Sequence, residues 1–415
     1  MKKQKYLRPG IIFLVPLVFI FSQCLRQAKP TDPRGANFAG SAACLKCHSN
    51  IYKNYFHSAH FLTSRFPMVS NVHGSFNPDS NTVVFNNGLK AVMEKHKDGL
   101  YEASYAHGKK MRSERLDIAF GSNRGETFLY WRGNKVYQLP VSYYISLHQW
   151  ANSPGYNPDS VDFSRVIGAR CFECHASFIK SLPDSTGSIE KSDLLDRTSL
   201  VLGIDCERCH GPGAAHVNFQ TRNSDQKQPM YMTRINSLTR QQRIDQCSVC
   251  HSGNSNIMTR STFDFKPGDT LAKYTSGTPF HAYQDVAKVD VHGNQVKLLT
   301  GSKCFMDSKI ECATCHSVHD NTIKTVSTYS QYCISCHSAA NHNFCKMAGQ
   351  LGAVINTNCI DCHMPVKTSQ SIFINTAGKQ INAPFLARTH LIAIYPDNSK
   401  KIMAMLKAQK STKKQ

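Results

Sequence analysis

The pentapeptide Cys-x-x-Cys-His occurs seven times in this chain, and no other feature limits its fold as strongly. The seven copies, numbered in chain order as motifs I to VII, are Cys44–His48, Cys171–His175, Cys206–His210, Cys247–His251, Cys312–His316, Cys333–His337 and Cys359–His363. They contain 14 of the 17 cysteines. The fold must therefore repeat one local chemistry at seven places along 415 residues.

Three kinds of chemistry use such cysteine pairs. A structural zinc site joins two pairs, with histidine at a variable distance, whereas here the number of pairs is odd and histidine follows each pair directly. A thioredoxin-like disulfide needs one pair and no fixed histidine. The pattern is instead typical of covalent haem c attachment, in which both thiols bond the porphyrin and the adjacent imidazole coordinates iron.

We therefore predict seven covalently bound haem c groups. The predicted attachment points are the motif thiols, namely Cys44, Cys47, Cys171, Cys174, Cys206, Cys209, Cys247, Cys250, Cys312, Cys315, Cys333, Cys336, Cys359 and Cys362. The predicted proximal iron ligands are His48, His175, His210, His251, His316, His337 and His363.

Twelve of the 19 histidines lie outside the motifs, which is enough for a second ligand on every iron. The predicted distal ligands are His60, His216, His319, His342 and His390. Further candidates are His57, His148, His281 and His292, and the remaining three, His73, His96 and His107, are interpreted as ordinary polar residues.

The spacing of some distal candidates predicts closely packed haems. His319 stands three residues after His316, and on a helical turn both would share one face. They could not then bind opposite sides of one porphyrin, so His319 must reach another haem. The same argument applies to His216 after motif III and to His342 after motif VI. Haems joined in this way could pass electrons to one another.

The N-terminus predicts export. Lys2, Lys3, Lys5 and Arg8 precede the apolar run 11–21, which is short for a membrane span. Cys24 follows at the place of a lipoprotein cysteine, although Gln23 departs from the small residue usual there. We predict a lipoprotein-type signal peptide over 1–23, with ordinary cleavage and an uncleaved anchor as alternatives. The mature chain would lie on the periplasmic side of a bacterial membrane or on the cell surface, anchored through lipidated Cys24.

The rest of the chain predicts a mainly α fold with much irregular structure, organised around the haems. We expect a flexible linker over 24–40, one multihaem domain over 41–398 and a basic tail over 399–415. The 122 residues between motifs I and II contain short β-type runs, so a β-rich insertion is expected near 70–145. A hairpin is predicted there, with Arg132-Gly133-Asn134-Lys135 at its turn.

The net charge of +21 does not by itself indicate nucleic-acid binding. Loss of the signal peptide and gain of seven ferric haems, each adding about −1 through its propionates, leave roughly +10. We therefore predict no nucleic-acid partner. Apart from Cys24 of the signal region, two cysteines lie outside the motifs, Cys304 and Cys345. We predict a disulfide between them; two separately buried thiols are the alternative.

The sequence resembles the cytochrome c-554 family of multihaem cytochromes, which is more distantly related to hydroxylamine oxidoreductase. The resemblance rests on "GIDCERCHGPGAAHV" (203–217), "SKCFMDSKIECATCHSVHD" (302–320), "NCIDCHMP" (358–365), and "LPVSYY" followed by "WANSPGY" (139–156). It implies a mainly helical fold with close haem pairs, distal ligation by His60, His216, His319 and His390, and cysteines at the positions of Cys304 and Cys345.

The function predicted from these features is electron relay between redox protein donors and acceptors, through mostly bis-histidine haems. One alternative is an enzyme acting on nitrite, hydroxylamine or a related small nitrogen compound at one five-coordinate haem. The other is an anchored haem subunit of a respiratory complex. The sequence contains no Cys-x-x-Cys-Lys segment, which is the alternative proximal motif of haem nitrite reductases.

Overall fold

The computed structural model describes residues 32–183, 193–253, 257–276, 285–320, 324–341, 344–376 and 381–412. The predicted signal peptide, Cys24, His281 and His342 lie outside the described residues. Within that part of the chain, no helix has both the length and the apolar character needed to cross a bilayer.

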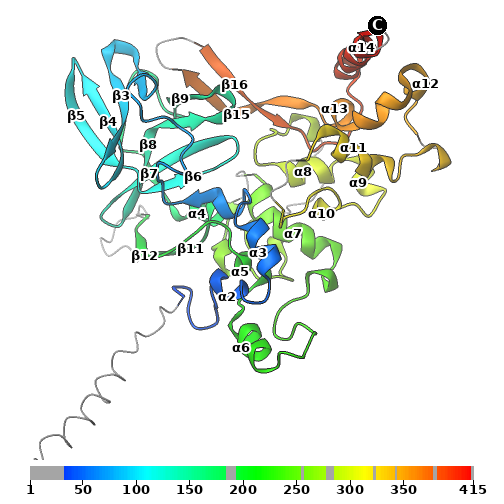
Figure 1. The fold of residues 1–415 in the computed structure, drawn as a ribbon, viewed down its shortest axis with the longest axis horizontal. Helices are drawn as coiled ribbons and strands as arrows, with labels where there is room; N and C mark the ends of the chain where they lie inside the picture. The colour runs from blue at the N-terminus through cyan, green and yellow to red at the C-terminus, as the bar shows by residue number, and fades with distance from the viewer. Residues whose placement is uncertain are drawn as a thin grey trace, which may run out of the picture.

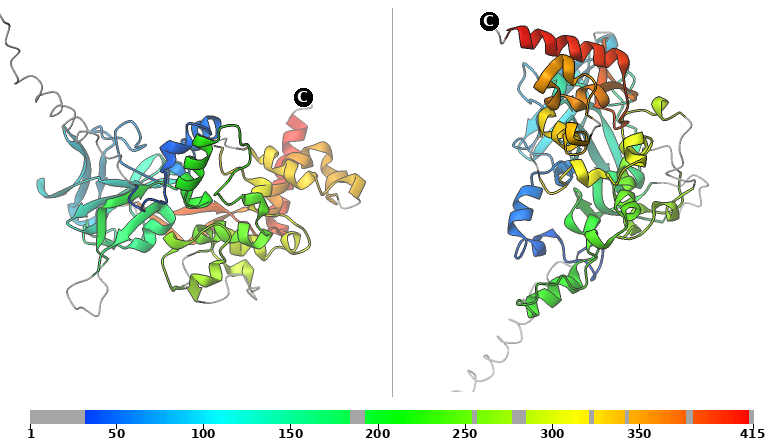
Figure 2. Two further views of the ribbon diagram at one scale, coloured as in Figure 1. Left: turned by 90° about the horizontal axis from the view of Figure 1, so that it is seen from below. Right: turned by 90° about the vertical axis from the view of Figure 1, so that its right-hand side faces the viewer.

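The prediction of a mainly α fold is wrong. The described residues contain sixteen strands in five sheets, and the predicted β-rich insertion accounts for only part of them. Two strands also follow motif II and two follow motif VII, and each of these pairs forms an antiparallel hairpin. Figure 1 shows the two larger sheets at one end of the molecule and the helices of motifs V to VII at the other, and Figure 2 shows the same division from below.

The larger sheet has the strand order β1-β6-β7-β8-β10, with β9 also paired to β8. Its strands are β1 (Ser64–Arg65), β6 (Ile118–Phe120), β7 (Gly125–Arg132), β8 (Lys135–Tyr144), β9 (Gln149–Asn152) and β10 (Val166–Ile167). The predicted hairpin is confirmed, because Arg132 pairs with Lys135 across the two-residue turn. Gly133 has a φ of 57° there, as the favoured hairpin turns require.

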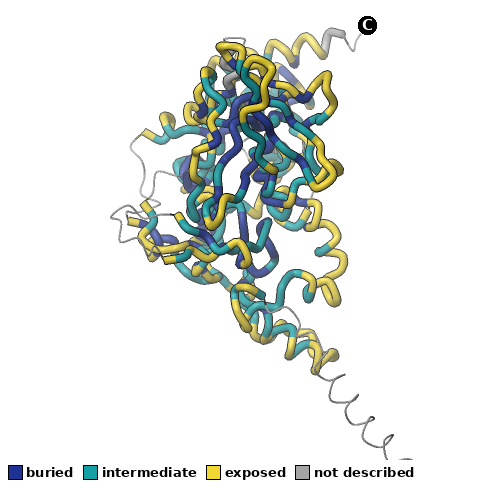
Figure 3. Tube along the Cα trace, turned by 90° about the vertical axis from the view of Figure 1, so that its left-hand side faces the viewer, coloured by how far each residue is buried: buried dark blue, intermediate teal, exposed yellow. Residues whose placement is uncertain are grey.

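The second sheet has the order β2-β3-β4-β5, formed by β2 (Thr82–Val84), β3 (Lys90–His96), β4 (Gly99–Ala106) and β5 (Lys109–Arg115). Alternate residues of β3, such as Ala91 and Met93, are buried in one apolar core with Leu139, Val141 and Trp150 of the larger sheet. This period of two is what a sheet with one covered face requires. Figure 3 shows the buried residues concentrated in these strands.

Glu102 of β4 is a carboxyl group inside this apolar core. Its side chain is 1% exposed, and its Oε1 atom has no hydrogen-bond partner. Burial raises the pKa of Glu102 well above its usual value, against an opposing hydrogen bond from the backbone of Val141. The folded protein therefore holds Glu102 in its protonated form.

Replacing Glu102 with glutamine is expected to flatten the dependence of stability on pH. A raised folded-state pKa gives stability that is complete below the unfolded value of about 4.3 and is lost as pH rises toward the folded value, at up to about 1.4 kcal/mol per pH unit. Calorimetric melting of both proteins between pH 5 and 8 measures the effect. Glu94→Gln serves as the control, since ion pairing lowers the pKa of the less buried Glu94 despite partial burial. If the melting temperatures of wild type and Glu102→Gln changed with pH by the same amount, this prediction would be contradicted.

The remaining elements surround the seven motifs. Motifs I to IV lie on or beside α2 (Ser41–Cys44), α3 (Ser49–Tyr55), α4 (Ala169–His175), α5 (Cys206–His210), α6 (Ala214–Arg222) and α7 (Arg240–His251). Motifs V to VII lie among α8 (Gln295–Thr300), α9 (Lys303–Met306), α10 (Cys312–Cys315), α11 (Val326–Ile334), α12 (Ala348–Leu351), α13 (Cys359–His363) and α14 (Pro396–Thr412). The small hairpins are β11 (Ala176–Ser181) with β12 (Leu195–Leu202), and β13 (Ile257–Met258) with β14 (Thr275–Ser276).

A long hairpin connects the two ends of the molecule. Strand β15 (Val366–Thr376) begins beside motif VII and runs toward the larger sheet, and the antiparallel β16 (Ile381–Arg388) returns to motif VII (Figure 1). There Ile374 is buried against Tyr144 and Ala151. Residues far apart in the sequence thus form one continuous apolar contact between the sheet end and the helical end.

Residues 32–40, inside the predicted flexible linker, are held by a buried ionic network. The Arg34 guanidinium contacts the carboxylates of Asp32 at 2.8 Å, Asp205 at 2.7 Å and Glu207 at 3.1 Å. Glu207 also accepts hydrogen bonds from the backbone N–H groups of residues 39, 40 and 213. Because Asp205 and Glu207 belong to the α5 segment, the network ties the start of the described chain to motif III.

Candidate functional site: seven motifs and their paired imidazoles

A helical turn gives each described motif the shape that haem attachment needs. The backbone N–H of His48 donates to the carbonyl of Cys44 at 2.9 Å, and the same bond joins His316 to Cys312 and His337 to Cys333. Positions i, i+3 and i+4 then lie on one side of the turn. Both thiols and the imidazole of a motif therefore face the same space.

Four motif histidines face a second imidazole supplied by a distant segment. His48 and His216 have ring centres 6.5 Å apart, and His210 and His319 have ring centres 5.9 Å apart. The separation is 6.2 Å both for His251 with His60 and for His316 with His390. The rings are within 27° of parallel in three pairs, and nearly perpendicular in the pair of His251 with His60.

These separations fit one iron between two imidazoles. A metal–imidazole bond is about 2.0 Å and the ring centre lies about 1.2 Å beyond the nitrogen, so two rings on opposite sides of one iron have centres about 6.4 Å apart. All four pairs fall within half an ångström of that value. The donor set and its spacing therefore fit haem iron at motifs I, III, IV and V.

The facing imidazoles connect motifs to one another. His216 begins the segment after motif III but faces motif I, and His319 follows motif V but faces motif III. The sequence argument that His216 and His319 turn away from their own motifs agrees with this arrangement. Its assumption of a helical turn at 316–319 is wrong, because α10 ends at Cys315 and His316 has an extended backbone.

Hydrogen bonds at Nδ1 orient several of these imidazoles. Nδ1 of His216 lies 2.9 Å from the carbonyl oxygen of Met230, and Nδ1 of His363 lies 2.9 Å from that of Ala393. A carbonyl can only accept, so Nδ1 carries the proton in both rings. Nε2 is then left with its lone pair, and such a bond also fixes the orientation of a metal-binding ring.

Burial keeps two of the facing imidazoles neutral. It lowers the pKa of His60 to about 4, with smaller effects from His251 and His316. It also lowers the pKa of His390 to about 4, with a smaller effect from His316. Neutral imidazole is the form that can coordinate a metal.

Thiols of different motifs meet in pairs. The side chains of Cys44 and Cys206, Cys174 and Cys250, Cys247 and Cys312, and Cys333 and Cys359 lie within hydrogen-bonding reach. The partner thiol lowers the pKa of Cys206 to about 7, and Cys174 and Cys359 are affected in the same way. Motif I thus adjoins III, II adjoins IV, IV adjoins V, and VI adjoins VII.

Two further contacts connect these groups. Gln246 beside motif IV donates to the carbonyl of Cys209 in motif III. Lys324 donates from Nζ to the carbonyl of Cys315 in motif V at 3.4 Å and to the hydroxyl of Tyr332 beside motif VI at 2.8 Å. All seven motifs therefore belong to one connected cluster.

Motif II differs from the four paired motifs. The ring of His175 stacks on Phe120, with centres 4.6 Å apart and planes 9° apart, and its Nδ1 lies 3.1 Å from the Thr63 hydroxyl. No ring contact within the described part of the chain joins His175 to a second imidazole. Burial lowers the pKa of His175, and His292 contributes a smaller electrostatic effect, so His292 is near it.

The other candidate ligands lie in varied surroundings. His57 is exposed beside Phe56, and His148 occupies a left-handed turn with φ 50°. His292 contacts Phe385 of the long hairpin. The predicted disulfide is not formed: Cys304 lies near Cys336, and Cys345 near Cys362, so each extra thiol is beside a different motif.

Sequence reasoning missed the residues that support the motif histidines. Thr63 at Nδ1 of His175 and Phe120 on its ring come from segments 112 and 55 residues away from it. Gln295, whose Oε1 is 3.3 Å from Nδ1 of His251, is 44 residues from its partner. No local pattern marks these positions, and only the fold brings them to the motifs.

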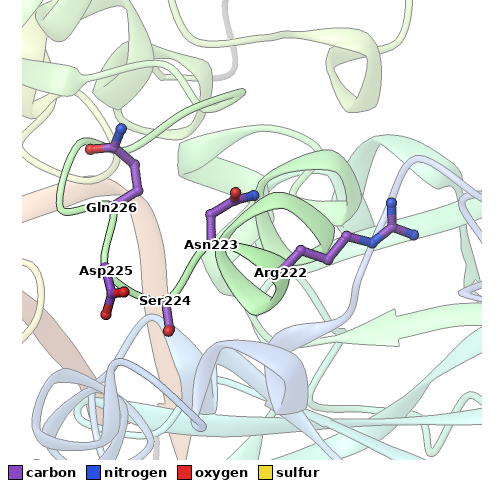
Figure 4. Close-up of a pocket in the computed structure, with 5 residues that line it drawn as sticks. All are labelled: Arg222, Asn223, Ser224, Asp225 and Gln226. Carbon is purple, nitrogen blue, oxygen red and sulfur yellow. The ribbon is translucent and has the colours of Figure 1, made fainter.

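A surface depression after α6 is formed by a single loop (Figure 4). Its lining residues are Arg222, Asn223, Ser224, Asp225 and Gln226. Their side chains point in different directions, and none belongs to a motif. The depression therefore supplies no converging groups for a ligand.

Comparison with known proteins agrees with the haem attachment that the motif geometry indicates. A family model described as cytochrome c554 and c-prime matches residues 154–211, which include motifs II and III. Among solved structures, the crystal structure of the outer cell wall cytochrome OcwA matches with a TM-score of 0.51, covering 88% of this chain and 81% of that one. These matches support a multihaem c-type cytochrome.

The predicted resemblance to the cytochrome c-554 family is thereby confirmed. Cytochromes of this kind bind haem c covalently and transfer electrons between redox partners. OcwA is 15% identical in sequence, so that comparison concerns the fold. No curated protein matches the chain.

Proposed function

We propose that this protein is an exported heptahaem cytochrome that relays electrons between redox partners through mostly bis-histidine haems. The observation that carries the proposal is the set of four imidazole pairs at 5.9–6.5 Å, each joining a motif to a distant segment. His216, His319, His60 and His390 are then the distal ligands of motifs I, III, IV and V. The haem supplies the redox chemistry, and the chain supplies ligands, spacing and exclusion of water.

The contacts between motifs support a relay order. Motif I adjoins III, III adjoins IV, and IV adjoins both II and V, followed by VI and VII. Motifs I, II and VII are the ends of this branched chain. Electrons entering at motif I would therefore leave at motif VII, or the reverse, with motif II as a side branch.

Export and anchoring belong to the same proposal. Covalent haem c attachment and the predicted lipoprotein signal support a location outside the cytoplasm, with Cys24 as the membrane anchor. The outer cell wall location stated for OcwA is consistent with this.

The proposal is tested by counting haems and their spin states. The intact protein is expected to carry the mass of seven haem groups per chain, and each Cys→Ala pair in one motif should remove one. Low-temperature EPR of the air-oxidised protein should show low-spin ferric haem for at least motifs I, III, IV and V. A count below seven, or high-spin signals from most haems, would contradict the proposal.

A second function is favoured by one observation: among the described residues no ring contact pairs His175 of motif II with a second imidazole, whereas motifs I, III, IV and V each have such a pair. An iron with a vacant position there could bind nitrite, hydroxylamine or a related small molecule. The same EPR measurement decides between the two. A high-spin signal from one haem in seven that changes on adding nitrite, and disappears with Cys171→Ala/Cys174→Ala, would favour the enzyme.

A further inference from the structure

We propose that the outward face of α14 is the docking surface for an acidic redox protein, which exchanges electrons with the cytochrome through motif VII. This inference rests on the proposed function as an electron relay and names the partner at one of its ends. The surface consists of Lys400, Lys401 and Lys407, all exposed. Figure 2 shows α14 lying along the outer edge of the molecule.

Charge is distributed unevenly along the chain. Residues 32–320 contain 32 Lys and Arg against 26 Asp and Glu, whereas residues 321–415 contain 11 against only two. Two ferric haems, at about −1 each, still leave that segment with an excess near +7. The segment that holds motifs VI and VII is therefore the more basic part of the chain, which favours an acidic partner.

Few carboxylates are available to neutralise the lysines of α14. The two in residues 321–415 are Asp361 and Asp397. Asp361 is bound to Arg388 at 2.8 Å. Asp397 lies in the first turn of α14, where its charge is favourable with the helix dipole. The lysines thus present their charge to solvent and to whatever approaches.

The basic helix begins in direct contact with motif VII. Asn398 donates from Nδ2 to the carbonyl of Asp361 at 2.6 Å, and the hydroxyl of Ser399 hydrogen-bonds to the thiol of Cys362. Asp361 and Cys362 are both within motif VII. A partner held on α14 is therefore held beside the haem that ends the relay.

The apolar residues of α14 argue for a protein partner over a lipid surface. Ile402, Met403 and Leu406 pack on Leu351 and Ile355 within the protein, and Leu406 is 5% exposed. A helix that lies in a membrane interface needs its apolar face free for the lipid. Here these three side chains are used internally, and the outward side carries the lysines with one exposed apolar side chain, Met405.

The test is charge reversal on α14 with a matched control. The triple variant Lys400→Glu/Lys401→Glu/Lys407→Glu changes the proposed surface. The control, Lys95→Glu/Lys97→Glu/Lys109→Glu, makes the same change in net charge at exposed positions on β3, the β3–β4 turn and β5, at the opposite end of the molecule (Figure 1). Stopped-flow spectroscopy measures the rate at which each ferric holoprotein is reduced by a reduced acidic [2Fe–2S] ferredoxin.

At low ionic strength the α14 variant is expected to react at least tenfold more slowly than wild type, because steering by opposite charge raises association rates 10-fold or more. The two rates should converge as salt increases. The reduction rate of the control variant should fall much less than that of the α14 variant. An equal loss in both variants, or no loss in either, would overturn the docking surface.

Two further measurements separate the other outcomes. Reduction by a small neutral quinol should be unchanged in the α14 variant; if wild type accepts electrons from neither quinol nor ferredoxin, the electron-relay function itself fails. Sedimentation with phosphatidylglycerol vesicles tests the lipid alternative. Vesicle binding that the α14 variant loses, without a change in the ferredoxin rate, would assign the surface to the membrane and overturn the proposal.

Discussion

Replacing His319 with alanine is expected to convert one ferric haem in seven, that of motif III, from low spin to high spin. His319 faces His210 at 5.9 Å with planes only 10° apart, and it comes from the segment that follows motif V. Its loss would leave that iron with one strong ligand. Because axial ligands set haem potentials over a range of about 0.8 V, we expect the potential of this haem to rise by about 0.1 V or more.

EPR of the oxidised variant and a spectroscopic redox titration measure both effects. His57→Ala is the matched control, since His57 is an exposed imidazole and faces none of the motif histidines in the ring contacts found among the described residues. The control should keep the spectrum and potentials of wild type. If His319→Ala remained wholly low spin with unchanged haem content, the ligand assignment for motif III would be refuted.

Replacing Arg34 with methionine is expected to lower the free energy of unfolding by about 3–5 kcal/mol, the range found when one partner of a buried ion pair is removed. The Arg34 side chain is 4% exposed, and its partners Asp205 and Glu207 are 5% and 1% exposed. Methionine keeps a long unbranched side chain at this position but leaves the carboxylates of Asp32, Asp205 and Glu207 without their cation. The loss would be a large part of the 5–15 kcal/mol typical of a domain.

Chemical denaturation followed by far-UV circular dichroism measures this loss, and limited proteolysis should show faster cleavage within residues 32–40. Arg115→Met is the control because the Arg115 side chain is 44% exposed beside Asp117, and such surface pairs contribute about 1 kcal/mol or less. Similar losses in the two variants would show that the Arg34 network adds nothing beyond a surface pair.

Haem-attachment motifs can be predicted from the sequence because that chemistry is local. Two thiols and an imidazole within five residues need only one helical turn to share a face. The hairpin at Arg132–Lys135 can also be predicted from the sequence, since the alternating strand residues and the turn residues are adjacent along the chain. What these cases share is that every interacting residue lies within a short window of sequence.

The strands outside the insertion were missed for identifiable reasons. β12 (Leu195–Leu202) contains the polar run 196–199, which shows no strand alternation, and β16 contains Pro384, which argues against a strand unless it lies at an edge. In a two-stranded hairpin both strands are edges, so Pro384 is tolerated. The facing imidazoles could not be paired from sequence, because partners such as His60 and His251 are 191 positions apart.

The long-range pairing of imidazoles has a consequence for how such a protein is made. Under the proposed ligation, the haem of motif I waits for His216, that of motif III for His319, and that of motif V for His390, each from a part of the chain synthesised and exported later. His60 emerges early but its partner motif IV follows long after it. Each of these irons can therefore gain its second ligand only after both segments have been exported, so the haems would be completed at different stages of export. A premature stop near the C-terminus would then leave the earliest haems intact in their covalent bonds, yet the haem of motif V exposed to oxygen and peroxide.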